Sequence, residues 1–411
     1  MIQKAEWIYP AVSMKNVCPA FRRRFSAQEP IRQAKLLITS LGVYEAYLNG
    51  ERIGKNVLAP GWTSYSHRVQ VQEYDVTHLL QDENELVVTV GKGWFAGRIA
   101  CGTYQSVAED VRLIAALVLT EEGGSSRVIP TDTAWECAES QIRFSDIYDG
   151  ETYDARSVEQ DWKPCRIAQI SKNILIPQEG EPITEHERLK PVRLIHTPQG
   201  ETVIDFGQEI TGYVSFSVRA HANDEIVISH AEMLDAAGNF YTENLRSAKA
   251  QLRYICREGD QTYKPHHTFM GFRYIRLDSF PDEPDLSRFT AIVVHSQLRR
   301  TGEMITSSPL LNRLYQNIIW SQKDNFLDIP TDCPQRDERL GWTGDAEVFI
   351  RTAALNFDVK RFFRKWLRDM AAEQRSDGAI AYTVPLPNIT SWTGDEFCSG
   401  SAWIWAGWET P

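Results

Sequence analysis

Hydrophobic residues alternate with polar ones, or gather in short runs, over about the first 300 positions, which predicts β-strands there. The segments 36–48, 86–90 and 112–120 are rich in β-branched and aromatic residues. Asn49-Gly50, which follows the first of them, is typical of a type I′ hairpin turn. Turn residues recur roughly every 8–12 positions, a spacing that predicts an antiparallel β-sandwich.

Two stretches interrupt this pattern. Residues 135–153 are rich in carboxylates and predict a polar loop, and residues 176–191 are dense in Pro and Glu, as a linker would be. A second set of strands follows over 192–297. We therefore expect a first β-sandwich domain, of a carbohydrate-binding kind, over 1–175 and a second β-sandwich domain over 176–300.

Helical spacing replaces the strand pattern after about position 307. Ser308 suits the N-cap of a helix and Pro309 its first position. Over 310–325 the apolar side chains share one face, which we expect to be the buried one: Leu311, Leu314, Ile318 and Ile319.

Two more helices are predicted over 344–355 and 358–374. Phe362, Trp366 and Met370 recur every four residues in the second of them and form one apolar face. The order β, β, then α indicates separate domains rather than alternating βαβ units, with a third domain over 301–411.

Composition excludes several functions. The net charge of −11 argues against binding to nucleic acid or to an anionic membrane surface. No apolar run reaches 18 residues, and the N-terminus lacks the pattern of a signal peptide. The seven Cys are scattered and form no CxxC pair, so we expect reduced thiols in a cytoplasmic protein, without a zinc site.

A glycine-rich segment over 91–97 resembles a dinucleotide-binding loop, but its third Gly comes one residue late. Trp94 and Phe95 would crowd a pyrophosphate, and no βαβ unit surrounds them. We therefore interpret it as a turn within the sandwich and expect neither a nucleotide nor any other cofactor.

Side chains suited to catalysis are most closely spaced over residues 328–345, where five carboxylates are interrupted by two Pro and two Gly. Pro and Gly predict a loop between two helices, and loops on a rigid scaffold are where sites are built. Leu340 and Trp342 stand among the charges and suit a half-buried pocket. Arg336 and Arg339 separate the acids, so one carboxyl can keep its proton while others ionise, as a glycosidase requires. The alternative is a solvated polar loop.

The segment 332–345 reads DCPQRDERLGWTGD and resembles the signature of the bacterial α-L-rhamnosidases of glycoside hydrolase family 78. The resemblance covers nearly the whole chain. It extends to segments of both β regions: 44–50 (YEAYLNG), 61–65 (GWTSY), 93–94 (GW), 206–209 (FGQE), 241–246 (YTENLR) and 269–274 (FMGFRY).

This resemblance implies an inverting hydrolase that removes terminal α-L-rhamnose, with an (α/α)6 barrel after the two β domains. In this resemblance, Glu338 matches the position of the family's general acid. The residues that fall on positions holding the sugar are Asp332, Arg336, Trp342 and Asp345. Trp403 is a further candidate stacking face, although a Trp in the core is an equal alternative. Rhamnosylated glycosides or oligosaccharides are the expected partners.

Six helical hairpins need more residues than the chain has after Ser307, so the resemblance implies truncation within the catalytic domain. The family's general base is then expected beyond the end of the chain, and the chain alone is expected to be inactive. A barrel cut short would leave the face of Phe362, Trp366 and Met370 without partners. Two alternatives stay open: a non-catalytic carbohydrate-binding protein, and a related hydrolase for another sugar.

Overall fold

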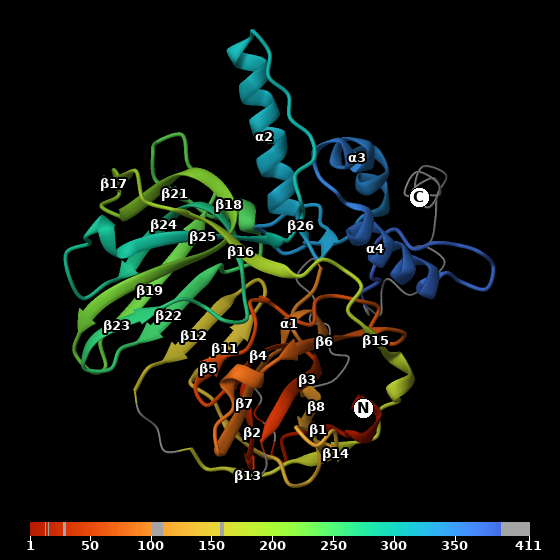
Figure 1. Cartoon of the computed structure of the whole chain (residues 1–411). Helices are drawn as coiled ribbons and strands as arrows, with labels where there is room; N and C mark the ends of the chain where they lie inside the picture. Colours follow the sequence, from red (N-terminus) through yellow and green to blue (C-terminus); the bar gives the residue numbers. More distant parts are fainter. Residues whose placement is uncertain (13, 15, 28–29, 101–109, 157–159, 388–411) are drawn as a thin grey trace.

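The computed structural model describes residues 1–12, 14, 16–27, 30–100, 110–156 and 160–387. Figure 1 shows a β-sandwich at the bottom, a second β domain to the left, and a helical region above both. The predicted order of two β domains followed by helices is confirmed.

Two sheets make up the first sandwich. The seven-stranded sheet contains β1 (Trp7–Tyr9), β3 (Ile31–Leu41), β6 (Val69–Asp75), β8 (Arg112–Glu121), β9 (Ser126–Pro130), β14 (Arg166–Ala168) and β15 (Leu175–Pro177). The six-stranded sheet contains β2 (Pro19–Ser26), β4 (Val43–Leu48), β5 (Glu51–Arg52), β7 (Glu83–Gly91), β10 (Glu136–Glu139) and β13 (Lys163–Pro164). The short helix α1 (Gly93–Ala96) follows β7, where the glycine-rich segment stands.

Gly42 carries the chain from one sheet of the sandwich to the other. The single strand predicted over 36–48 is therefore two strands, β3 in the seven-stranded sheet and β4 in the six-stranded sheet. Gly42 has a φ of 128°, and a Cβ at this position would lie 2.5 Å from the carbonyl oxygen of Gly91. Only glycine can make this crossing without strain. The turn after β4 is confirmed as predicted, with positive φ at both Asn49 and Gly50.

The second β domain is built on a ten-stranded sheet. Its strands are β11 (Ile142–Asp146), β12 (Gly150–Asp154), β16 (Ile183–Leu189), β17 (Arg193–His196), β18 (Thr202–Ala220), β19 (Glu225–Ala231), β22 (Gln251–Ile255), β23 (Gly259–Tyr263), β24 (Met270–Ser279) and β25 (Phe289–Ser296). The hairpin of β20 (Met233–Leu234) and β21 (Phe240–Tyr241) lies outside it. β18 changes partners along its length, because it pairs with β17 and β24 near its start and with β25 and β23 near its end.

The β11–β12 hairpin crosses the boundary predicted between the two β domains. It was expected as a polar loop over 135–153, but it forms two strands, and β12 pairs in parallel with β22 of the ten-stranded sheet. Its carboxylates include one that makes structural contacts. Glu151 is buried and accepts hydrogen bonds from Tyr263 and from the backbone of His266 and His267. The linker-like stretch also contains strands, with β15 joining the first sandwich and β16 the second sheet. The boundary at residue 175 stays a prediction.

The helical region contains α2 (Pro309–Asn325), α3 (Thr343–Asn356) and α4 (Lys360–Glu373), with a small hairpin of β26 (Phe326–Leu327) and β27 (Ile329–Pro330) after α2. Ser308 caps α2 as predicted, accepting a hydrogen bond from the backbone N–H of Leu311. None of the helices among the described residues combines the length and the apolarity needed to cross a membrane.

The apolar face predicted for α2 is buried only in part, because Ile319 is buried but Leu311 and Leu314 are exposed. Leu311 and Leu314 are 49% and 53% exposed, whereas Tyr315 and Ile319 are buried. The N-terminal half of α2 projects past the sheets (Figure 1), so the apolar side chains there have nothing to pack against among the described residues. Helical spacing showed an apolar face but not which part of the helix meets the sheet.

The apolar face of α4 is buried, contrary to the expectation for a barrel cut short. Phe362, Trp366 and Met370 are at most 4% exposed. The Phe326 ring of the β26–β27 hairpin stacks on Phe362 with a centroid distance of 4.6 Å, and the indole N–H of Trp366 donates to the carbonyl of Val384. The hairpin and the chain after α4 therefore cover this face.

Candidate active site

Residues 331–342, which we call the acidic loop, form the loop between β27 and α3, beside the C-terminal end of α2. A loop joining two helices is what the Pro and Gly residues predicted. Asp332, Arg336, Glu338 and Trp342 lie on this loop, and Asp345 lies in the first turn of α3. The free N–H groups of that turn favour a negative charge.

Arg339 holds the loop against the second β domain. Its side chain is 1% exposed and donates to four backbone carbonyls: Ile147, Phe269, Gln335 and Arg336. Its guanidinium also lies over the rings of Tyr148 and Phe269. The sequence had suggested that Arg339 separates acids of the site; instead it anchors the loop that bears them.

Three side chains hold the Glu338 carboxylate. Arg336 and Arg246 each place a guanidinium nitrogen 3.0 Å from Oε2. The indole N–H of Trp342 donates to Oε1 at 3.1 Å. The Glu338 side chain is only 12% exposed, and its backbone carbonyl accepts a hydrogen bond from Tyr148. These contacts fix the direction of the carboxyl group, as general acid catalysis requires.

Asp332 lies next to Glu338 and shares a cation with it. Arg336 Nη2 is 3.6 Å from Asp332 Oδ2 as well as 3.0 Å from Glu338 Oε2. Asp332 Oδ1 accepts a hydrogen bond from the backbone N–H of Leu340 at 2.7 Å. Burial, with a further contribution from the charge of Glu338, raises the pKa of Asp332 to about 6. Arg336 thus links the two carboxylates that the sequence predicted to lie together.

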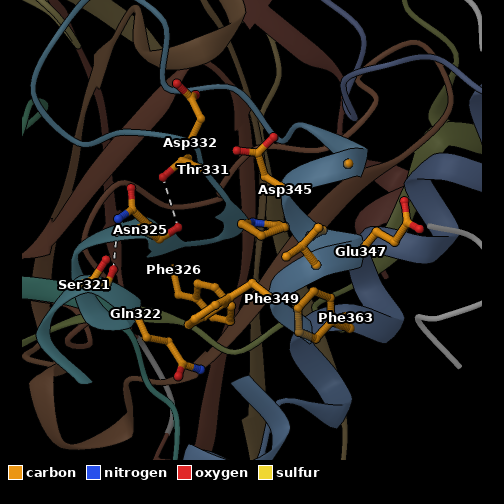
Figure 2. Close-up of a pocket in the computed structure, with 14 residues that line it drawn as sticks. Ser321, Gln322, Asn325, Phe326, Thr331, Asp332, Asp345, Glu347, Phe349 and Phe363 are labelled. Atoms are coloured by element: carbon orange, nitrogen blue, oxygen red, sulfur yellow. Dashed lines mark hydrogen bonds between the residues drawn. The ribbon is translucent and has the colours of Figure 1, made fainter. Parts of the chain in front are cut away.

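Asp332 and Asp345 line a pocket of about 700 Å³ between α2, α3 and α4. Figure 2 shows these two carboxylates and Thr331 at one end and the rings of Phe326, Phe349 and Phe363 at the other. Burial, together with the charge of Glu338, raises the pKa of Asp345. A cavity with oxygen groups at one end and aromatic groups at the other suits a ligand that is polar on one side only.

Asp337, the other acid beside Glu338, is bound elsewhere. Its carboxylate accepts a hydrogen bond from Ser247, which also receives one from Arg98. Arg98 is in turn paired with Asp149 at 2.6 Å. Asp337 is therefore part of the contact between the loop and the second β domain.

One group among the described residues has the spacing of metal ligands: an oxygen of Asp332, the thiol of Cys333 and an oxygen of Glu338, all within 4.8 Å of one another. The chemistry does not suit an ion. Arg336 already supplies a positive charge to both carboxylates, and burial raises the pKa of Cys333 to about 12, which keeps the thiol protonated. The absence of a metal stays a prediction.

Sequence reasoning assigned no role to Arg246, although the segment containing it supported the family resemblance. Arg246 follows a single 3-10 turn with a φ of 57° and reaches Glu338 from the second β domain. The site is thus completed by a side chain from outside the helical region. Trp403, the candidate stacking residue, lies outside the described residues.

Three family models match the chain in succession. Residues 29–187 match the α-L-rhamnosidase N-terminal domain, residues 195–295 the bacterial α-L-rhamnosidase concanavalin-like domain, and residues 299–410 the bacterial α-L-rhamnosidase six-hairpin glycosidase domain. Together they follow the order of domains that the sequence predicted.

Several α-L-rhamnosidases are similar to this protein along most of the chain. An α-L-rhamnosidase from Streptomyces avermitilis is 40% identical over 370 residues, which are 86% of this chain and 36% of that protein. The crystal structure of an α-L-rhamnosidase from Aspergillus terreus superposes with a TM-score of 0.90 at 37% identity, covering 93% of this chain and 47% of that one. The Streptomyces avermitilis enzyme in complex with L-rhamnose also gives a TM-score of 0.90 at 37% identity, covering 96% of this chain and 40% of that one. The chain spans less than half the length of these relatives.

Proposed function

The chain belongs to the bacterial α-L-rhamnosidases of glycoside hydrolase family 78, and we propose that it supplies the general acid and the sugar-binding carboxylates of an inverting α-L-rhamnosidase. The observation that carries this proposal is the position of Glu338. Its carboxyl is oriented by Arg336, Arg246 and Trp342 beside Asp332. In this role Glu338 protonates the glycosidic oxygen as the bond to the anomeric carbon breaks.

Asp332 is too close to Glu338 to serve as the general base of inversion. An oxygen of each lies within 4.8 Å of the other, whereas inverting carboxyls stand roughly 6.5–9.5 Å apart to admit a water behind the sugar. We therefore assign Asp332 to the sugar hydroxyls. Another carboxylate must therefore serve as the general base of inversion.

The chemistry of rhamnose matches the pocket between Asp332 and Asp345. Rhamnose is a 6-deoxy sugar, with hydroxyls that need hydrogen-bond partners and one methyl group that does not. The two carboxylates at one end can accept hydrogen bonds from the hydroxyls, and the rings at the other end can bury the methyl group. Arg336 and Trp342, which both contact Glu338, contribute to binding of the same sugar.

The test compares two substitutions on two substrates. Residues 1–387 replace the matching segment of the Streptomyces avermitilis relative, and turnover is measured on a nitrophenyl α-L-rhamnoside and on a rhamnosyl disaccharide. Glu338→Gln keeps the shape of the side chain but has no proton to give. It should lower disaccharide turnover by about 10²–10⁴-fold and affect the nitrophenyl substrate far less, because nitrophenolate leaves without protonation.

Asp345→Asn is the matched variant. Its proposed contact is with the sugar ring, which both substrates share, so both should be weakened alike. Equal losses on the two substrates for Glu338→Gln would remove Glu338 from the acid role. Binding of rhamnose without any turnover in the chimera would instead favour a non-catalytic carbohydrate-binding protein.

A further inference from the structure

Cys137 and Cys165 form a pair inside the first sandwich, far from the candidate active site in the fold. Cys137 lies on β10, and Cys165 directly follows β13, the strand that pairs with β10. The backbone N–H of Cys165 donates to the carbonyl of Trp135 at 3.0 Å. Trp135 precedes Cys137 by two positions, so its side chain and those of both cysteines lie on one face of the sheet, and all three belong to the same buried core.

The two thiols are in contact. Both cysteines are free, and their side chains are hydrogen-bonded to each other. Cys137 is 1% exposed and Cys165 is 5% exposed, so the contact is shielded from water. Thiols that already meet between adjacent strands need little movement of the backbone to form a disulfide.

The contact also makes the two thiols chemically different. The hydrogen bond from Cys165 lowers the pKa of Cys137, and the same bond, together with burial, raises the pKa of Cys165. Cys137 is therefore the better nucleophile of the pair, while Cys165 keeps its proton. Burial raises the pKa of the other cysteines among the described residues, which are Cys18, Cys256 and Cys333.

The position of β13 gives a small molecule a route to the pair. β13 is the last strand of the six-stranded sheet, and both of its residues are exposed. It lies at the lower rim of the sandwich in Figure 1. Short segments at the edge of a sheet open locally at a low cost in free energy. Opening of β13 would uncover Cys165 and, beneath it, the sulfur of Cys137.

We propose that Cys137 and Cys165 are an oxidation site, at which hydrogen peroxide converts the two thiols into a reversible disulfide. The Cys137 thiolate attacks one oxygen of the peroxide, so that an S–O bond forms, the O–O bond breaks and hydroxide leaves. The sulfur of Cys165 then attacks the sulfenic acid of Cys137. The S–S bond forms, the S–O bond breaks, and the departing hydroxide takes the proton of Cys165 and leaves as water.

The disulfide would close a loop around the β11–β12 hairpin. This hairpin lies between the two cysteines in the chain and pairs with β22 of the second β domain. A cross-link at its base restricts the unfolded chain and prevents β13 from separating from β10. Oxidation should therefore slow amide hydrogen exchange in β10 and leave exchange in β18 unchanged.

The experiment treats the 411-residue chain with hydrogen peroxide, alkylates the remaining thiols and locates cross-linked peptides by mass spectrometry. We expect a Cys137–Cys165 cross-link that dithiothreitol reverses. Cys165→Ser keeps a hydrogen-bond donor beside Cys137 but cannot form the disulfide. In this variant Cys137 should remain a sulfenic acid that dimedone traps, with at least about tenfold more label than Cys256, because only Cys137 has a lowered pKa.

Cys256→Ser is the matched control, because Cys256 is a buried cysteine of the second β domain, and it should cross-link as the wild type does. Cys137 and Cys165 that are both still alkylated after treatment of the wild type would overturn the inference. A cross-link of either residue to a different cysteine, or equal dimedone labelling of Cys137 and Cys256, would also overturn it. If Cys165→Ser fails to fold, the wild-type cross-link and the slower exchange in β10 decide the matter.

Discussion

Lys365 and Asp328 form a buried ion pair, with Nζ 2.9 Å from Oδ2, at the junction of the first sandwich and the helical region. Lys365 also donates to the carbonyl of Trp62, and the Trp62 N–H donates to Asp328 Oδ2 at 2.5 Å. Asp328 is the turn residue of the β26–β27 hairpin, which leads directly into the acidic loop. The 61–65 segment is thus bonded to the base of the candidate active site.

Lys365→Met should strongly destabilise the chain. It leaves the Asp328 carboxylate buried without its cation, and breaking a buried pair on one side typically costs about 3–5 kcal/mol. The free energy of unfolding, from urea denaturation, is the measurement. Lys360→Met is the control: Lys360 is exposed at the start of the same helix, and its loss should change stability by less than about 0.5 kcal/mol. Similar effects of the two variants would contradict the role given to the pair.

Arg339→Lys tests the anchor of the acidic loop. A lysine ammonium cannot reach four carbonyls arranged around a planar guanidinium, so at least one buried acceptor should lose its donor, at about 1–3 kcal/mol each. We expect lower stability and faster amide hydrogen exchange over 331–342. The control is Arg364→Lys on the exposed face of α4. Unchanged exchange over the loop in Arg339→Lys would show that other contacts hold it.

The stereochemistry of the first product tests the proposed mechanism. Inversion of an α-L-rhamnoside releases β-L-rhamnose, which proton NMR can detect before the anomers equilibrate. The chimera with the Streptomyces avermitilis relative is the sample. Release of the α-anomer first would indicate retention, which uses carboxyls only about 5–5.5 Å apart. Asp332 would then become the candidate nucleophile, because it lies that close to Glu338.

Asp332→Asn should change how stability depends on pH. Burial raises the pKa of Asp332 from 3.8 to about 6, so between these values the folded chain binds a proton that the unfolded chain has lost. The contribution of Asp332 to stability therefore falls as the pH rises from about 4 to about 6. The difference in unfolding free energy, variant minus wild type, should rise over this window by at most about 3 kcal/mol and then level off.

Asp260→Asn makes the same chemical change at an exposed position and is the control. A flat difference curve for Asp332→Asn would show that Asp332 is ionised as readily in the folded chain as in the unfolded one. Only the slope is interpreted, because the substitution also alters the bond from Leu340 and the contact with Arg336.

The strands and helices were predictable where the pattern that forms them is local. The turn at Asn49-Gly50 and the cap at Ser308 depend on two or three adjacent residues, and both were predicted correctly. The change of sheet at Gly42 was not, because a run of β-branched residues does not show which sheet it joins. The exposure of Leu311 and Leu314 was missed for a similar reason, since burial depends on how far the sheets extend along the helix.

The same difference between local and long-range contacts applies to the candidate active site. Asp332, Arg336 and Glu338 were predicted together because seven consecutive positions contain all three. Their partners come from far along the chain: Arg246 is 92 positions from Glu338, and Tyr148 is 190 positions away. No local pattern marks contacts at such separation. The acidic loop could be recognised from sequence, but its attachment to the second β domain could not.

The β11–β12 hairpin has a consequence for how this protein can be divided. The domains of large enzymes are often treated as interchangeable modules that can be cut from one protein and joined to another. Here, removing residues 1–175 would also take two strands from the sheet that follows, leaving the Gln251–Ile255 edge open for another chain to pair with. Any fusion that separates the first two domains therefore invites aggregation through this edge.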